Sequence, residues 1–212
     1  MPDLSKLTVI DHPLIRHKLH LLRSVETSRK VFRELVDEIT TLMTYEATRS
    51  LPVQEVEVRT PLETMVGHRL AGHAPVVVPV LRAGLGMVAG VLTVVPGARV
   101  GHVGIKRDHE SLQPVEYYFN VPAHAETLRF IVVDPMLATG GSAAATIAGL
   151  KARGASQVSL MCLVAAPEGV DRLAREHPDV SVFAAVLDRQ LNDKGYILPG
   201  LGDAGDRLFG TE

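Results

Sequence analysis

The run VVVPVL at residues 76–81 constrains the fold most, because it carries no charged residue on either face of a strand. Such a run is typical of a parallel strand that is covered by helices on both faces. Further apolar runs follow at LRFIVVD (128–134), VSLMCLVAA (158–166) and VSVFAAVLD (180–188). We therefore predict an α/β fold in which a mostly parallel, twisted sheet has helices on both faces.

Stretches with helical spacing alternate with these strands. After Ser28, a predicted helix places Val31, Leu35, Ile39 and Leu42 on one face, with charged residues between them. Three more helices are expected near residues 87–95, over AAATIAGLKARG (143–154), and near 168–177. Ligands of such sheets bind outside the carboxyl ends of the strands, so we expect the functional residues there.

Three less regular segments complete the prediction. QEVEVRT (54–60) alternates as a half-buried strand would, and TPLE (60–63) has the pattern of a capping box that starts a helix. A strand is expected near 98–105, and VEYYFNV (115–121) is expected to add a strand or a hairpin arm.

Composition sets the remaining limits. The 212 residues are 46% hydrophobic and 22% charged, which suits one globular domain, with a core at about 50–187 and a C-terminal tail at about 188–212. The net charge of -2 gives no general attraction to nucleic acid or to membranes. The single cysteine, Cys162, is expected to be a buried and inert thiol. No segment has the length and apolarity of a membrane-spanning helix, and we expect a cytoplasmic protein.

The segment VVDPMLATGGS (132–142) ends a buried strand on an acid and then enters a helix through small residues. Amides at a helix start are unpaired, and glycines let an anion approach them, so Thr139 to Ser142 are predicted to hold a monophosphate. Asp134 is placed to accept hydrogen bonds from the hydroxyls of a sugar. A simple strand-to-helix turn with Ser142 as the N-cap would explain the small residues but not the acid.

A second strand end carries Arg82 in LRAGLG (81–86), where a guanidinium needs an anion. The same stretch matches the dinucleotide pattern G-x-G-x-x-A at residues 84–89, with Asp108 as a candidate ribose acid. The next strand instead ends in Lys106 and Arg107, and two cationic strand ends suit a diphosphate better. The polar loop that follows (106–118) is predicted to be a flap that closes over a reactive ligand. Together these features predict a ligand that has a sugar with a monophosphate at one end and a diphosphate at the other. 5-Phosphoribosyl 1-diphosphate (PRPP) is such a ligand.

VVDPMLATGGS resembles the PRPP motif of type I phosphoribosyltransferases, in the form found in the uracil phosphoribosyltransferase family. The resemblance extends through VPVLRAGLGM, GIKRDHESLQPVEYY and GYILPGLGDAGDRLFG, and so covers nearly the whole chain. It implies transfer of the 5-phosphoribosyl group from PRPP to uracil N1, with Asp134, Arg107 and Asp203 as catalytic residues. The residues implied to bind PRPP are Arg82, Arg107, Asp134, Pro135, Met136, Leu137, Ala138, Thr139, Gly140, Gly141, Ser142 and Asp203.

The resemblance assigns uracil to the tail, through Ile197, Gly202, Asp203 and Ala204. Amide and carbonyl groups of a fixed backbone suffice to read uracil, and the Gly and Pro content of residues 195–210 predicts neither a helix nor a central strand. Where the wider superfamily has two adjacent acids, this chain has Asp134 and Pro135. Mg²⁺ is therefore expected to reach the protein through PRPP and water, with no direct protein ligand and with Asp203 as a candidate outer contact.

Members of this family are oligomers, so the resemblance implies a homodimer or homotetramer, and GTP is a candidate effector. The spacing His17 to His20 is expected to belong to a solvated basic face rather than to a metal site. The neighbouring basic residues are alternative candidates for an interface or an effector site, namely Arg16, Lys18, Arg23, Arg29 and Lys30. Two other functions remain open at this point. One is a phosphoribosyltransferase-like regulator that binds RNA, and the other is a dinucleotide-binding oxidoreductase.

Overall fold

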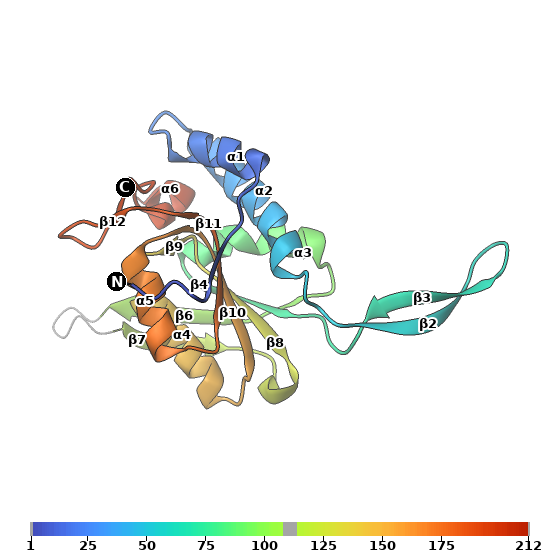
Figure 1. The fold of residues 1–212 in the computed structure, drawn as a ribbon. Helices are drawn as coiled ribbons and strands as arrows, with labels where there is room; N and C mark the ends of the chain where they lie inside the picture. The colour runs from blue at the N-terminus through green and yellow to red at the C-terminus, as the bar shows by residue number, and fades with distance from the viewer. Residues whose placement is uncertain (1, 108–113, 212) are drawn as a thin grey trace.

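A computed structural model describes residues 2–107 and 114–211 of the chain, and it contains the predicted central sheet (Figure 1). Neighbouring strands of the main path are parallel except for the last pair, β6 and β7, which are antiparallel. The α/β prediction is therefore confirmed. The strand order is β1 (Leu7–Val9), β11 (Ser181–Leu187), β10 (Gln157–Ala165), β8 (Arg129–Val133), β4 (Val76–Leu81), β6 (His102–Arg107) and β7 (Pro114–Asn120). Two short strands, β5 (Arg99–Val100) and β9 (Met136–Leu137), pair with β4 and β10.

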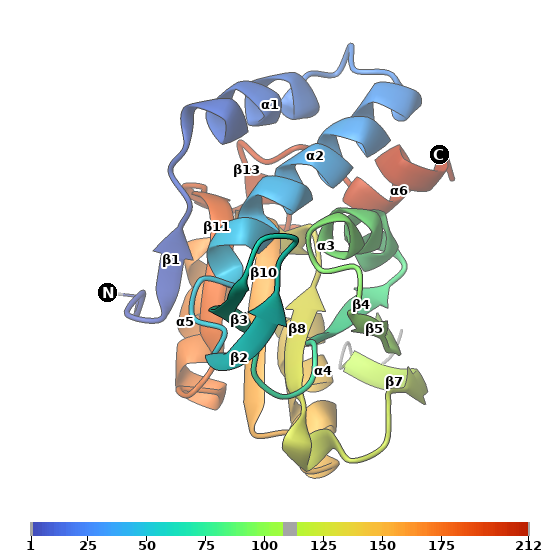
Figure 2. The same cartoon turned by 90° about the vertical axis from the view of Figure 1, so that its right-hand side faces the viewer.

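Helices cover both faces of the sheet, as the uncharged strands require (Figure 2). One face packs against α4 (Gly141–Ala152) and α5 (Pro167–Glu176), and the core there includes Val78, Val132 and Leu160. Side chains that alternate with these, such as Val77, Ile131 and Met161, point to the opposite face. The core on that face also receives residues of α1 (Pro13–Arg23), α2 (Arg29–Ala47), α3 (Val88–Val94) and α6 (Ala204–Phe209). Two 3-10 turns, η1 (Ala83–Met87) and η2 (Ala125–Thr127), complete the helical elements.

The predicted buried face of α2 is partly wrong. Leu35 and Ile39 are buried as expected, but Val31 is 41% exposed and Leu42 is half-buried. The buried stripe is shifted by one residue at each end, because Phe32 and Met43 provide larger apolar side chains for the core. The observed stripe consists of Phe32, Leu35, Val36, Ile39, Thr40, Met43 and Thr44.

The prediction for residues 54–63 is wrong in two respects. Residues Val53–Arg59 (β2) pair antiparallel with Thr64–Leu70 (β3), so a hairpin replaces the expected helix. The Thr60 hydroxyl does accept hydrogen bonds from the amides of Leu62 and Glu63, as in a cap, but these bonds close the turn of the hairpin. The strands are also not half-buried, because the hairpin projects away from the sheet (Figure 1) and most of its residues are exposed.

The C-terminal tail is more ordered than its Gly and Pro content predicts. It forms a short hairpin of β12 (Gln190–Leu191) and β13 (Ile197–Leu198), and then the helix α6, which corrects the expectation that it contains no helix. The prediction for Cys162 is confirmed in that the side chain is fully buried. Within residues 2–107 and 114–211, no helix has both the length and the apolarity to cross a membrane.

Candidate functional site

The sheet is interrupted between β8 and β9, directly after Asp134. The Pro135 carbonyl accepts hydrogen bonds from the amides of both Leu163 and Val164 on β10. The regular one-to-one pairing with β10 is therefore broken at Pro135. Since Pro135 has no amide to donate, the chain leaves the ladder here and rejoins it at Met136. The Asp134 side chain is thereby free to accept a hydrogen bond from the Met136 amide at 3.3 Å. The Asp-Pro pair thus fixes a carboxylate at the carboxyl end of the central strand.

The Asp134 carboxyl lies in a site that disfavours its charge. Removal from water raises the pKa of Asp134 to about 7, and the negative charge of Asp203 also raises it, while the Met136 amide lowers it. A carboxylate in such a place gains most from ligand hydroxyls, because they supply the hydrogen bonds that solvent does not. Burial, together with the charge of Asp134, also raises the pKa of the Cys162 thiol well above its usual range, so this thiol is not a nucleophile.

The loop between β9 and α4 forms a concave turn of backbone amides. Gly140 is in the left-handed region at φ +76°, which glycine adopts without strain, and its carbonyl accepts the first hydrogen bond of α4. In the described part of the chain, no side chain caps this helix end, so the alternative with Ser142 as N-cap is wrong. A Cβ on Gly169 would lie 2.5 Å from the Ala138 carbonyl oxygen, so α5 presses tightly on the outside of the loop. The loop therefore presents free amides that suit an anion.

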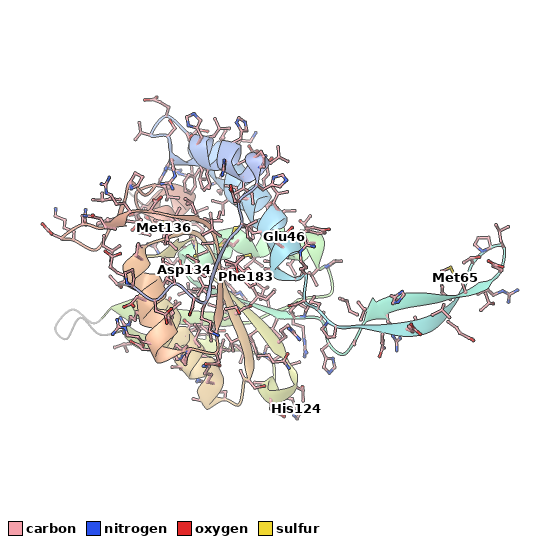
Figure 3. All side chains as sticks on the ribbon, in the orientation of Figure 1. Glu46, Met65, His124, Asp134, Met136 and Phe183 are labelled. Carbon is pink, nitrogen blue, oxygen red and sulfur yellow. The ribbon has the colours of Figure 1, made fainter. Side chains whose placement is uncertain are left out.

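A cavity of about 290 Å³ brings the predicted polar residues together. Asp134, at the end of β8, and Asp203, at the start of α6, line it together with the loop of residues 138–143. Figure 3 labels Asp134 and Met136 at this end of the sheet, far from Met65 on the projecting hairpin. The full lining is Asp134, Met136, Leu137, Ala138, Thr139, Gly140, Gly141, Ser142, Ala143, Lys194, Gly195, Tyr196 and Asp203.

Asp203 has a structural task as well as a place in the cavity. Its Oδ1 accepts a hydrogen bond from the Asp206 amide at 3.0 Å, which makes it the N-cap of α6. The residue is exposed, and its second carboxylate oxygen is available to a ligand or to water. The side chain therefore connects the end of the tail to the cavity.

The other residues predicted to contact uracil lie beside the cavity rather than in its lining. Ile197 and Ala204 are buried and belong to the core against α1 and α2, so only their backbone groups can face a ligand. Gly202 is exposed and left-handed at φ +82°, directly before Asp203. The segment from 197 to 204 thus offers backbone groups near the carboxylate of Asp203.

The cationic strand ends are only partly described. Arg82 follows β4 and is 59% exposed, and its guanidinium lies 3.8 Å from the Asp206 carboxylate, outside the lining of the cavity. Arg107 ends β6, next to β7, and its position along the strand is the one predicted. The residues 108–113 of the predicted flap, including Asp108, lie outside the described residues.

The G-x-G-x-x-A match at residues 84–89 has a packing role. A Cβ on Gly84 would lie 2.4 Å from the Val133 carbonyl oxygen, and one on Gly86 would lie 2.9 Å from the Leu208 side chain. Both glycines are thus needed for close packing within the protein, and their turn is a 3-10 helix. The pattern has an explanation without a dinucleotide.

Two cations near the cavity were not predicted from the sequence. Lys194 lines the cavity from the turn between β12 and β13, where the Asn192 side chain accepts hydrogen bonds from the amides of Lys194 and Tyr196. The stretch NDKG (192–195) is a turn pattern that would have indicated this hairpin. Arg172 on α5 reaches within 3.2 Å of the place where a Cβ on Gly141 would lie. The sequence around Arg172 does not indicate that its side chain lies beside Gly141, because this contact joins two helices.

The carboxylates of the cavity fit a metal ion that the ligand itself carries. Among the residues that the structure describes, no group of three or more His, Cys, Asp or Glu side chains could hold a metal. His17 and His20 are exposed on α1, as expected for a solvated face. Mg²⁺ keeps several waters and binds through one or two carboxylates together with phosphate oxygens, which this donor set allows.

The comparisons with known proteins agree over nearly the whole chain. A family model described as uracil phosphoribosyltransferase matches residues 9–211. Proteins of that name from Bacillus licheniformis and Halalkalibacterium halodurans are each 58% identical over 209 residues, covering 99% of this chain and 100% of each relative. The solved structure of the AQ2163 protein from Aquifex aeolicus has a TM-score of 0.91 at 38% identity, and covers 97% of this chain and 99% of its own.

A purine phosphoribosyltransferase from Pyrococcus horikoshii shares the fold, with a TM-score of 0.52 at 15% identity over 74% of this chain and 84% of its own. The fold is therefore that of the type I phosphoribosyltransferases. The family-model match over residues 9–211 and the relatives at 58% identity show that the chain belongs to the uracil phosphoribosyltransferase family.

Proposed function

We propose that this chain transfers the 5-phosphoribosyl group of PRPP to N1 of uracil, giving UMP and diphosphate. Its family membership supports the reaction. The assignment of residues rests on one observation. The N-terminus of α4, which has no side-chain cap, lines the same cavity as the carboxylates of Asp134 and Asp203.

The 5-phosphate of PRPP binds in the loop of residues 138–143. The amides at the start of α4 donate to its oxygens, the hydroxyls of Thr139 and Ser142 add donors, and the helix dipole favours the negative charge. Lys194 lines the same cavity and adds a positive charge near this end. Pro135 lies beneath the site as a buried residue, and contributes by breaking the strand rather than by contact.

The ribose lies over Asp134, whose carboxylate accepts hydrogen bonds from the two vicinal hydroxyls. The transition state resembles an oxocarbenium ion, so the main tasks of the protein are to hold the sugar in place and to stabilise the departing diphosphate. Arg82 and Arg107 are assigned to the diphosphate. No protein nucleophile is required, since uracil N1 is the attacking atom.

Mg²⁺ bound together with PRPP would supply positive charge to the diphosphate. Asp203 would hold it through water as an outer carboxylate. The cavity carboxylates of Asp134 and Asp203 support this arrangement, because each has a free oxygen and neither belongs to a metal-ligand cluster in the described residues.

Uracil is read by the backbone between Ile197 and Ala204, with Asp203 orienting the base or assisting loss of its N1 proton. Uracil presents two carbonyl acceptors and one N3–H donor, which amide and carbonyl groups can match. Cytosine presents an amino group in place of O4 and would leave a backbone donor unpaired. Sites that hydrogen-bond a substrate group can reject analogues lacking it by several powers of ten.

The chain acts as one unit over residues 1–212, with a core at about 50–187 and the base-reading tail at 188–212, and it functions as a homodimer or homotetramer in the cytoplasm. The projecting hairpin supports an oligomer, because a lone two-stranded hairpin is marginally stable in water. Its exposed apolar residues include Val53 (59%), Met65 (48%) and Val66 (56%). GTP remains the candidate effector, and sedimentation with and without GTP tests both assignments.

The reaction is tested by measuring diphosphate release from PRPP with uracil, cytosine, hypoxanthine and orotate in parallel. The proposed function predicts rapid release with uracil and release at the background rate with the other three bases. Equal release with orotate or hypoxanthine would contradict the assignment of the tail to uracil.

A further inference from the structure

One ion pair, with a buried carboxylate and a partly buried guanidinium, connects the N-terminal helix α1 to the base-reading tail. The guanidinium of Arg23 donates to both carboxylate oxygens of Asp188, at 2.7 and 2.8 Å. The same guanidinium donates to the Gly200 carbonyl at 2.6 Å, and the Gly200 amide donates to Asp188 at 2.8 Å. The carbonyl and the amide of Gly200 are therefore both hydrogen-bonded to this ion pair.

The environment makes this connection rigid. The side chain of Asp188 is 5% exposed and that of Arg23 is 22% exposed, so water competes little for their hydrogen bonds. A two-pronged guanidinium–carboxylate contact fixes orientation as well as distance. Loss of one partner would leave the other charge buried without compensation.

The residue that is held lies at the centre of the base-reading segment. Gly200 is left-handed at φ +62°, and a Cβ there would lie 2.2 Å from the Ile197 carbonyl oxygen, so the chain turns tightly between Ile197 and Gly202. The path of this turn decides where the amide and carbonyl groups of residues 201–204 point.

A second arginine, Arg207, holds the next residue of the turn by a hydrogen bond. Arg207 on α6 donates to the carbonyl of Leu201 at 2.8 Å and to the carbonyl of Ser24, which follows α1, at 2.6 Å. Its guanidinium also stacks over the ring of Phe32, with 4.3 Å between the central carbon and the ring centroid. Arg23 of α1 therefore holds the carbonyl of residue 200, and Arg207 of α6, itself anchored to Ser24 and Phe32, holds the carbonyl of residue 201.

We propose that Arg23, Asp188 and Arg207 are positioning residues that set the affinity and selectivity for uracil. They act through the backbone of residues 200–204, and the inference rests on the proposed reading of uracil by this segment. The PRPP loop of residues 138–143 belongs to other elements and is not hydrogen-bonded to these three residues in the described part of the chain. Asp203, which also lines the cavity, is held separately as the N-cap of α6 by the Asp206 amide. Replacement of the three residues is therefore expected to affect mainly the base rather than the sugar donor.

The experiment uses Arg23→Lys and Arg207→Lys in the full-length chain. Lysine keeps the positive charge but cannot make the forked contacts. Steady-state assays of diphosphate release give KM for uracil, KM for PRPP and the ratio of kcat/KM for uracil over cytosine. We expect the KM for uracil to rise at least tenfold, the KM for PRPP to change less than twofold, and the selectivity to fall at least tenfold.

Lys18→Met is the matched control. Lys18 also extends from α1 and lies 2.5 Å from Glu38 on α2, so the variant removes an α1–α2 ion pair that does not involve the tail. Its uracil KM and selectivity should equal those of the wild type. If Arg23→Lys does not fold, Arg207→Lys and Asp188→Asn carry the test.

Folded variants with the wild-type KM for uracil and wild-type selectivity would overturn the inference. A parallel rise in KM for uracil and PRPP would also overturn it, because it would indicate general loosening of the fold. If the wild type released no diphosphate with uracil, the proposed function would fail instead, so the two failures are distinguishable.

Discussion

Replacement of Asp134 by asparagine should lower the activity and raise the free energy of unfolding of the ligand-free protein. The gain in stability should increase with pH. The pKa of Asp134 is raised from 3.8 to about 7 in the folded protein, whereas in the unfolded chain the carboxyl ionises near its usual value. Each pKa unit corresponds to about 1.4 kcal/mol, so the ionised carboxylate costs the folded ligand-free protein about 4 kcal/mol at pH 8. At pH 5 the cost is only about 2 kcal/mol, because the folded protein then retains the proton.

The sign follows from proton binding. Between about pH 4 and pH 7 the folded state binds more protons at Asp134 than the unfolded state does, so this group lowers the free energy of unfolding as the pH rises. Asparagine is neutral at every pH and removes the effect. The wild type should therefore lose stability relative to Asp134→Asn from pH 5 to pH 8, by about 2 kcal/mol.

The assay is urea unfolding of both proteins at pH 5, 6, 7 and 8, without ligand, with diphosphate release measured at pH 8. The difference between the two proteins should level off above pH 7, and the variant should lose at least about a hundredfold in turnover, equivalent to about 3 kcal/mol. A stability difference that does not vary with pH would refute the account of the Asp134 environment. Turnover near that of the wild type would remove Asp134 from the sugar site.

Three further predictions concern the cavity and the sheet. Asp203→Asn keeps an N-cap of equal quality, so its melting temperature should not change while uracil turnover falls at least about tenfold; unchanged kinetics would show that the tail is misassigned. Gly141→Ala places a methyl group 3.2 Å from Arg172 and over the anion loop, so KM for PRPP should rise while KM for uracil stays constant in the same assay. Gly84→Ala would drive a Cβ to 2.4 Å from the Val133 carbonyl oxygen, and urea unfolding should show a loss of about 3 kcal/mol or more; an unaffected protein would contradict the packing role of the glycine.

The sequence was sufficient to predict the sheet and the turn of small residues that leads from Asp134 into α4. Strands β4, β8 and β10 are uncharged because both of their faces are covered, and this local pattern is visible without any long-range information. The loop from Asp134 to Ser142 was equally visible, since an acid after two valines and a pair of glycines before a helix have few structural explanations.

The errors have a common physical origin in interactions that the local sequence does not encode. Thr60 makes the hydrogen bonds of a helix cap, yet the next residues pair with the preceding strand, because cross-strand pairing competes with the helix. Gly200 lies in the tail, where the Gly and Pro content predicted no helix, and its position is fixed by Arg23, which lies 177 positions earlier. Contacts at that separation depend on the completed fold.

The assignment of the cavity is tested most directly by a crystal structure of the protein with UMP, the proposed product. We expect the 5-phosphate to contact the amides of residues 140–143, Asp134 to accept hydrogen bonds from the ribose hydroxyls, and the base to face the backbone of residues 202–204. Solvent alone beside the start of α4, with the nucleotide bound elsewhere, would contradict this assignment.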